Sequence, residues 1–180
     1  APLRAYDFMG EGLAQVEARL AAAGISFHLR FGPPEETIPA FVASEHIGAV
    51  VTDVDPLRLK TRWRKRVAER VNVLVEEVDT HNIVPVWIAS PKREYGARTF
   101  RPKIHGLLTE FLTAFPPLQR HPFPWRKPVL PTDWDAVLSR LKPDATVGPV
   151  SWTRPGEAAG AKTLGLFIKN RLEFYHAKRN

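Results

Sequence analysis

The feature that most constrains the fold is an alternation of predicted strands and helices in the first 80 residues. Ile25–Phe31 alternates apolar and polar residues, Gly48–Asp53 is a short apolar run, and Val73–Asp79 is a third run rich in valine. Helical periodicity separates them, first at Glu35–Glu45 and then in an Arg- and Lys-rich stretch after Pro56. A short continuous apolar run is typical of a strand buried on both faces. This alternation predicts a parallel α/β sheet with right-handed crossovers.

An amphipathic helix is predicted ahead of these strands. Apolar residues recur at three- and four-residue intervals within Leu3–Ala23, and Gly24 stands in the place of a helix stop. A helix in this alternation should follow a strand, and the sequence begins with Ala1 instead of Met. We therefore expect one or two βα units to be missing, so that this chain holds part of a Rossmann-like sheet with an open edge.

The prolines indicate where regular structure ends. The chain has 17 in 180 residues, nearly twice the usual ~5%, and twelve of them lie from Pro85 onward. Lys103–Ala114 is a predicted helix with Pro102 at its first position, where the missing N–H costs nothing. Residues 115–132 read as an extended connector, and Gly156–Lys178 returns to helical periodicity.

Composition excludes several classes of protein. The chain has no Cys, so it holds no disulfide, thiolate metal site or Cys nucleophile. Its hydrophobic fraction of 44% is that of a globular chain. No apolar run approaches the ~18 residues of a membrane span and no secretory leader is recognisable, so we expect a cytosolic protein without a membrane partner. The histidines are too scattered to predict a metal site.

A run of seven cations is the sharpest electrostatic feature of the chain, within an overall charge of +7. Its members are Arg58, Lys60, Arg62, Arg64, Lys65, Arg66 and Arg70. Such a run is able to bind phosphates with a strong salt dependence. The alternative is a solvated helix face, which is favoured because the cations do not obviously share one stripe. Both interpretations stay open here.

Polar residues follow two of the predicted strands. Asp53 and Asp55 come after the apolar run, where open parallel sheets bind ligands, so they could accept hydrogen bonds from a nucleotide-like molecule. An Asx turn or a helix cap would explain them equally well. His81 follows the next strand with Asp79 nearby, which allows acid–base or ligand-binding chemistry, or an ordinary hydrogen-bonded loop residue.

A second basic segment, Glu94–Lys103, combines Arg98, Arg101 and Lys103 with two aromatic residues. A helix N-terminus of this kind suits anions. The alternative is a loop that Arg salt bridges tether to the sheet.

Several long motifs resemble class II cyclobutane pyrimidine dimer photolyases. The similar segments are Asp7–Leu13, Ile25–Leu29, Gly48–Asp53, Pro56–Arg58, Val78–Trp87, Glu94–Ile104 and Pro155–Asn180. The resemblance covers nearly the whole chain, and it implies three parts. Residues 1–114 would be the α/β antenna domain, residues 115–154 an interdomain linker, and residues 155–180 the first helix of an all-helical FAD domain that is absent here.

The resemblance implies light-dependent repair by the complete protein. Excited reduced FAD, bound outside this chain, would split cyclobutane pyrimidine dimers by electron transfer, after the damaged DNA has docked on the missing domain. This chain would be the antenna portion, inactive alone and without a catalytic residue, in a monomeric protein of the cytoplasm or, in a eukaryote, the nucleus.

An antenna deazaflavin or folate would bind at the carboxyl ends of the strands. Asp53, Asp55, His81 and Asn82, with Arg58 nearby, are the candidate residues. Two alternatives remain, a cryptochrome-like photoreceptor and a stand-alone nucleotide-binding α/β module.

Overall fold

The computed structural model describes residues 2–179, and within it the chain forms two compact units. One unit is Arg30–Pro117, and the other combines Ala1–Leu29 with Leu118–Asn180. Ala1, the first residue of the chain, and Asn180, the last residue of the final motif, lie outside the described residues.

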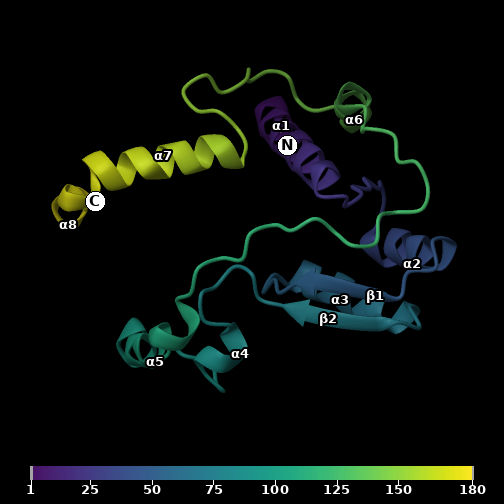
Figure 1. The fold of residues 1–180 in the computed structure, drawn as a ribbon. Coiled ribbons are helices and arrows are strands. Elements are labelled where there is room, and N and C mark those ends of the chain that lie inside the picture. The colour runs from purple at the N-terminus through teal and green to yellow at the C-terminus, as the bar shows by residue number, and fades with distance from the viewer. Residues whose placement is uncertain (1, 180) are drawn as a thin grey trace. The chain divides into compact units, whose positions relative to one another are not determined.

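The unit Arg30–Pro117 contains a parallel β-sheet of two strands, which lie side by side in Figure 1. Strand β1 (Ala49–Asp53) pairs with β2 (Leu74–Val78) in a register that runs from Ala49 opposite Leu74 to Asp53 opposite Val78. Helix α3 (Arg58–Arg70) connects them. This β–α–β arrangement, preceded by helix α2 (Pro34–Ser44), confirms the predicted α/β class with its partial, Rossmann-like parallel sheet.

The two faces of this sheet differ in what covers them. Val50 and Val75 face a cavity that residues of α2 and α3 also line, and the two helices pack against each other. On the other face, Val51 and Leu74 are 61% and 60% exposed. The described residues therefore cover one face of the sheet and leave the other largely open.

The predicted strand at Ile25–Phe31 is wrong, because no strand forms there among residues 2–179. A strand requires a hydrogen-bonded neighbour, and this segment is held by aromatic contacts instead. The rings of Phe27 and Trp134 lie 6.1 Å apart, and those of His28 and Trp125 lie 4.7 Å apart. The sheet consequently has two strands here, where the sequence predicted three.

Two further helices belong to this unit, the short α4 (Val86–Ala89) and the longer α5 (Ala97–Phe111). The predicted helix at Lys103–Ala114 is therefore displaced, since α5 begins six residues earlier and Pro102 lies inside it. Its first turn is held by Thr99, whose hydroxyl donates to the carbonyl of Gly96 at 3.0 Å and to the carboxylate of Glu94 at 2.9 Å. These contacts fix the helix start upstream of the proline.

In the other unit, helix α1 (Leu3–Ala22) packs on α6 (Trp134–Leu141), which the sequence analysis did not predict. The carboxylate of Glu17 accepts hydrogen bonds from the Thr132 amide at 2.8 Å and from Trp134 Nε1 at 3.0 Å. The segment 112–133 before α6 has neither helix nor strand, as predicted for the connector.

The final helical segment is interrupted. Helix α7 (Glu157–Asn170) ends before Arg171, and the 3₁₀ turn Leu172–Phe174 and the short helix α8 (Tyr175–Lys178) follow it. The continuous helix predicted over Gly156–Lys178 is thus two helices with a 3₁₀ turn between them. Among residues 2–179, no helix has the length and apolar character that crossing a membrane requires.

Candidate functional site

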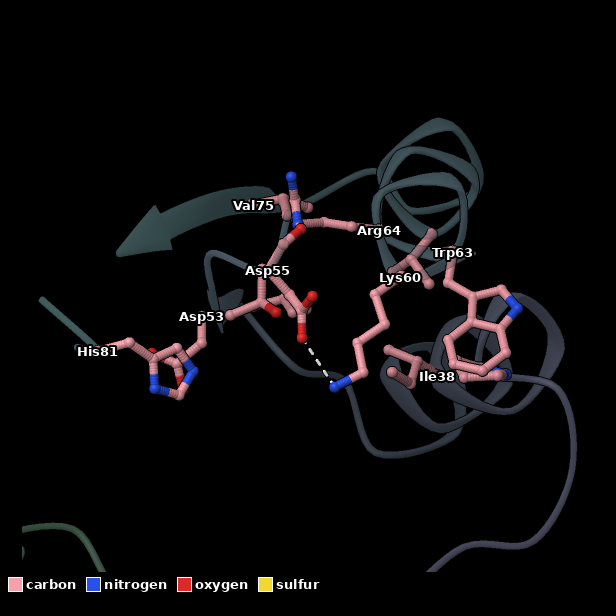
Figure 2. Close-up of a pocket in the computed structure, with 12 residues that line it drawn as sticks. Ile38, Asp53, Asp55, Lys60, Trp63, Arg64, Val75 and His81 are labelled. Atoms are coloured by element: carbon pink, nitrogen blue, oxygen red, sulfur yellow. Dashed lines mark hydrogen bonds and ion pairs between the residues drawn. The ribbon is translucent and has the colours of Figure 1, made fainter. Parts of the chain in front are cut away.

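A cavity of about 360 Å³ lies between one face of the sheet and helices α2 and α3. Figure 2 shows the ion pair between Asp55 and Lys60. It lies between the carboxyl end of β1, where Asp53 is, and helices α2 and α3, which carry Ile38 and Trp63. The full lining is Pro34, Ile38, Val50, Thr52, Asp53, Asp55, Lys60, Trp63, Arg64, Val67, Val75 and His81. The cavity thus combines an apolar floor and wall with charged groups at the strand ends.

Asp55 is anchored on both sides of its carboxylate. Oδ2 lies 2.7 Å from Lys60 Nζ, and Oδ1 accepts a hydrogen bond from the Leu57 amide at 2.9 Å. The Lys60 hydrogen bond and then the Leu57 amide lower the pKa of Asp55 below its usual value. The contact to Leu57 is the Asx turn that was one of the two sequence interpretations. Asp55 forms that turn and also lines the cavity.

Two further contacts fix the strand ends. The hydroxyl of Thr80 donates to the carboxylate of Asp53, which links the last residue of β1 to the loop that follows β2. Arg64 reaches from α3 to Glu77 on β2, with 2.7 Å between Nη2 and Oε1. The Thr80 contact holds the carboxylate of Asp53, and the Arg64–Glu77 pair ties α3 to β2.

Asp79 organises the loop that follows β2. Its Oδ1 accepts from the amides of His81 and Asn82 at 3.1 Å each, and its Oδ2 accepts from the amide of Val86 at 3.0 Å. The Asn82 side-chain amide bonds to both carboxylate oxygens. Burial raises the pKa of Asp79, but the hydrogen bonds from the Asn82 side chain and from these amides outweigh it, so the pKa lies below its usual value. Asp79 therefore contacts the backbone amide of His81.

A second, more open cavity of about 880 Å³ lies beyond this loop. His81 borders both cavities, whereas Asn82 borders the second. One wall holds a polar cluster in which Glu94 Oε1 lies 2.6 Å from Lys103 Nζ and accepts from the hydroxyl of Ser90 at 2.8 Å. Lys103 thus ties the loop to helix α5, and not to the sheet as the second sequence interpretation had it.

The structure brings together three of the five candidate residues. Asp53, Asp55 and His81 line the first cavity, but Arg58 lines neither cavity. Because an α-helix turns about 100° per residue, Arg58 lies about 200° around α3 from Lys60, which does face the cavity. Lys60 was not among the candidate residues predicted from the sequence.

The α3 residues that face the cavity share a helical spacing. They are Lys60, Trp63, Arg64 and Val67. The intervals of three, four and seven residues place them on one face, which the sequence spacing alone would have identified.

The chemistry of the first cavity is that of binding. Trp63 and Ile38 offer flat and aliphatic surface, while Asp53 offers a hydrogen-bond acceptor at the rim. Ligand cavities typically combine apolar walls with a few convergent polar groups, and volumes from about 300 Å³ upward are usual. The arrangement suits a flat, largely apolar ligand with hydrogen-bond donors on one edge.

Comparison with known proteins identifies the family. The family model described as DNA photolyase matches residues 2–122. A deoxyribodipyrimidine photo-lyase from Potorous tridactylus is 44% identical over 100% of this chain and 34% of its own length. Proteins of the same name from Arabidopsis thaliana and Oryza sativa subsp. japonica are each 37% identical, over 100% and 98% of this chain and 38% and 37% of their own lengths. The chain thus spans about a third of the length of these relatives. The chain belongs to the DNA photolyase family.

Proposed function

We propose that this chain is the antenna-chromophore portion of a class II cyclobutane pyrimidine dimer photolyase that repairs ultraviolet-damaged DNA in the light. The observation that carries the proposal is the family match over residues 2–122. In the complete enzyme, FAD bound outside this chain supplies the electron that splits the dimer, so the chain alone is expected to be inactive. We place the antenna domain at residues 1–114, the linker at 115–154 and the start of the catalytic domain at 155–180.

The first cavity is our proposed antenna site. A deazaflavin or folate is a flat heteroaromatic molecule with polar substituents, and the wall formed by Trp63 and Ile38 suits such a ring system. Asp53 would accept hydrogen bonds from the polar edge of the ligand, and the Asp55–Lys60 ion pair would fix its orientation. When bound, such a chromophore supplies absorbed light energy, while these residues hold and orient it.

The repair activity is tested with the protein from the complete reading frame that contains this chain. We expect dimers in damaged DNA to disappear under near-ultraviolet or blue light and to persist in the dark. Bound flavin without light-dependent repair would refute the repair function and favour a cryptochrome-like photoreceptor. Bound nucleotide with neither flavin nor repair would favour a nucleotide-binding module.

The antenna site is tested separately with Asp53→Ala and Asp55→Ala in the same protein. We expect loss of the antenna absorbance and of the repair that it sensitises, while repair by direct excitation of FAD continues. Glu76→Ala is the matched control, because Glu76 is an exposed carboxylate on β2 and does not line the cavity. Unchanged antenna absorbance in both Asp variants would contradict the assignment.

A further inference from the structure

The seven cations of α3 separate into two sets once their partners are known. Four make polar contacts within the unit: Lys60 with Asp55 at 2.7 Å, Arg64 with Glu77 at 2.7 Å, Arg66 with Glu35 at 3.4 Å, and Arg70 with the Glu35 carbonyl at 2.8 Å. The side chains of Arg58, Arg62 and Lys65 take part in no ion pair or hydrogen bond among residues 2–179. All three residues are exposed.

The three unpaired cations form one stripe. At about 100° per residue, Arg58, Arg62 and Lys65 fall within an arc of about 60°, on the side of α3 away from Trp63 and Val67. The seven cations together share no stripe, which spoke against phosphate binding, but these three do share one. Glu69 continues the stripe one turn further on and is the one acidic residue of α3.

The stripe has the dimensions of a contact to a nucleic-acid backbone. From Arg58 to Lys65 the helix rises about 10 Å at 1.5 Å per residue, and a DNA strand repeats its phosphates every 3.4 Å or so along the axis. The stripe therefore covers about three phosphate steps. It has no aromatic side chain and no buried hydrogen-bonding group that would read a base.

We propose that Arg58, Arg62 and Lys65 form an outer basic stripe that binds the phosphate backbone of duplex DNA without regard to sequence or damage. The stripe lies on the helix side opposite the antenna cavity, so it is a second binding surface of this unit. The choice of DNA over another polyanion rests on the proposed function. The positive charge of the stripe and its match to the phosphate spacing do not depend on that function.

The test measures binding of the full 180-residue chain to a short undamaged duplex in the dark, between about 50 and 200 mM salt. The variant is Arg62→Gln with Lys65→Gln, which leaves Arg58 and the antenna candidates intact. Each lost phosphate contact removes about 0.9 from the slope of log Kobs against log salt, so we expect the slope to fall by about 2. The matched control is Lys162→Gln with Lys169→Gln on α7, two exposed cations whose loss changes the net charge equally.

A second measurement locates the contact. Acetylation of Lys65, followed by mass spectrometry, should slow several-fold when the duplex is added, while acetylation of Lys162 stays unchanged. Equal losses of slope in both double variants, or equal acetylation of Lys65 with and without DNA, would overturn the proposal. Binding of the chain to phosphatidylserine vesicles, with no binding to DNA, would overturn it in favour of a membrane surface. Because the assay uses undamaged DNA in darkness, its failure is distinct from a failure of light-dependent repair.

Discussion

Substitution of Asp79 by Ala should loosen the loop that carries His81 and Asn82. The carboxylate accepts three backbone N–H groups at 3.0–3.1 Å. Such a bond contributes about 0.5–1.5 kcal/mol, and because Asp79 is half-buried, water will replace part of each one. We therefore expect a loss of about 2 kcal/mol for the three together, near the upper end of the cost of losing a helix-capping residue.

Hydrogen exchange measured by NMR reports this loss of stability separately for each amide. A loss of about 2 kcal/mol raises the exchange rate about 30-fold, which we expect at the amides of His81, Asn82 and Val86. The amide of Thr52 in β1 serves as the internal reference, because it lies two residues from Val54, whose N–H donates to Val78 of β2, and alternate amides of a strand face the same neighbour. Rates at the three loop amides that stay within about threefold of the wild type would refute the reasoning.

Asp79→Asn is the sharper variant. With its oxygen in the Oδ1 position, Asn keeps the acceptor for the amides of His81 and Asn82 and places an NH₂ group opposite the amide of Val86. We expect the Val86 amide alone to lose protection. Uniform loss at all three amides would mean that the charge of Asp79, and not the geometry of its oxygens, holds the loop.

Three further outcomes are expected. Val67 is 5% exposed, so Val67→Ala should cost about 1.5 kcal/mol of unfolding free energy in urea, and a change below about 0.5 kcal/mol would contradict its role in the core. Hydrogen bonds from Lys103, Ser90 and Thr99 lower the pKa of Glu94 to about 2, so its contribution to stability is complete above pH 4.5 and disappears as the pH falls toward 2. Lys103→Met should flatten that part of the stability–pH curve, and an unchanged curve would argue against the cluster. Gly156 has φ +92° and a Cβ there would meet the Gln15 side chain, so Gly156→Ala should lower the Tm, whereas an equal or higher Tm would refute this backbone constraint.

The sequence predicts the elements whose stabilising contacts are local. Strands β1 and β2 lie within a residue of their predicted bounds, and α3 forms in the Arg- and Lys-rich stretch after Pro56 where a helix was predicted, because apolar runs and helical spacing mark these elements directly. The segment Ile25–Phe31 has an equally good strand pattern but finds no neighbouring strand among the described residues. A segment with a strand pattern forms a strand only if a neighbouring strand pairs with it, and the pattern of the segment itself does not reveal whether that neighbour exists.

The same limit applies to the candidate site. The positions of Asp53 at the end of β1 and of His81 in the loop after β2 were predictable, since they follow from the order of the elements. The division of the α3 cations into paired and unpaired sets was not predictable from the sequence. It depends on Glu35 and Glu77, which contact α3 only in the folded unit. Arg58 is close to Asp55 in sequence, but the turn of the helix directs it away from the cavity.

The uncovered face of the β1–β2 sheet has a practical consequence for anyone who purifies this chain. Fluorescent dyes that report unfolding do so by binding apolar surface, and Val51 and Leu74 already present such surface in the folded unit. The dye would then be bright at low temperature and its melting transition shallow, although the unit is folded. Intrinsic tryptophan fluorescence is the better measure of melting here, because Trp63 lines the covered face.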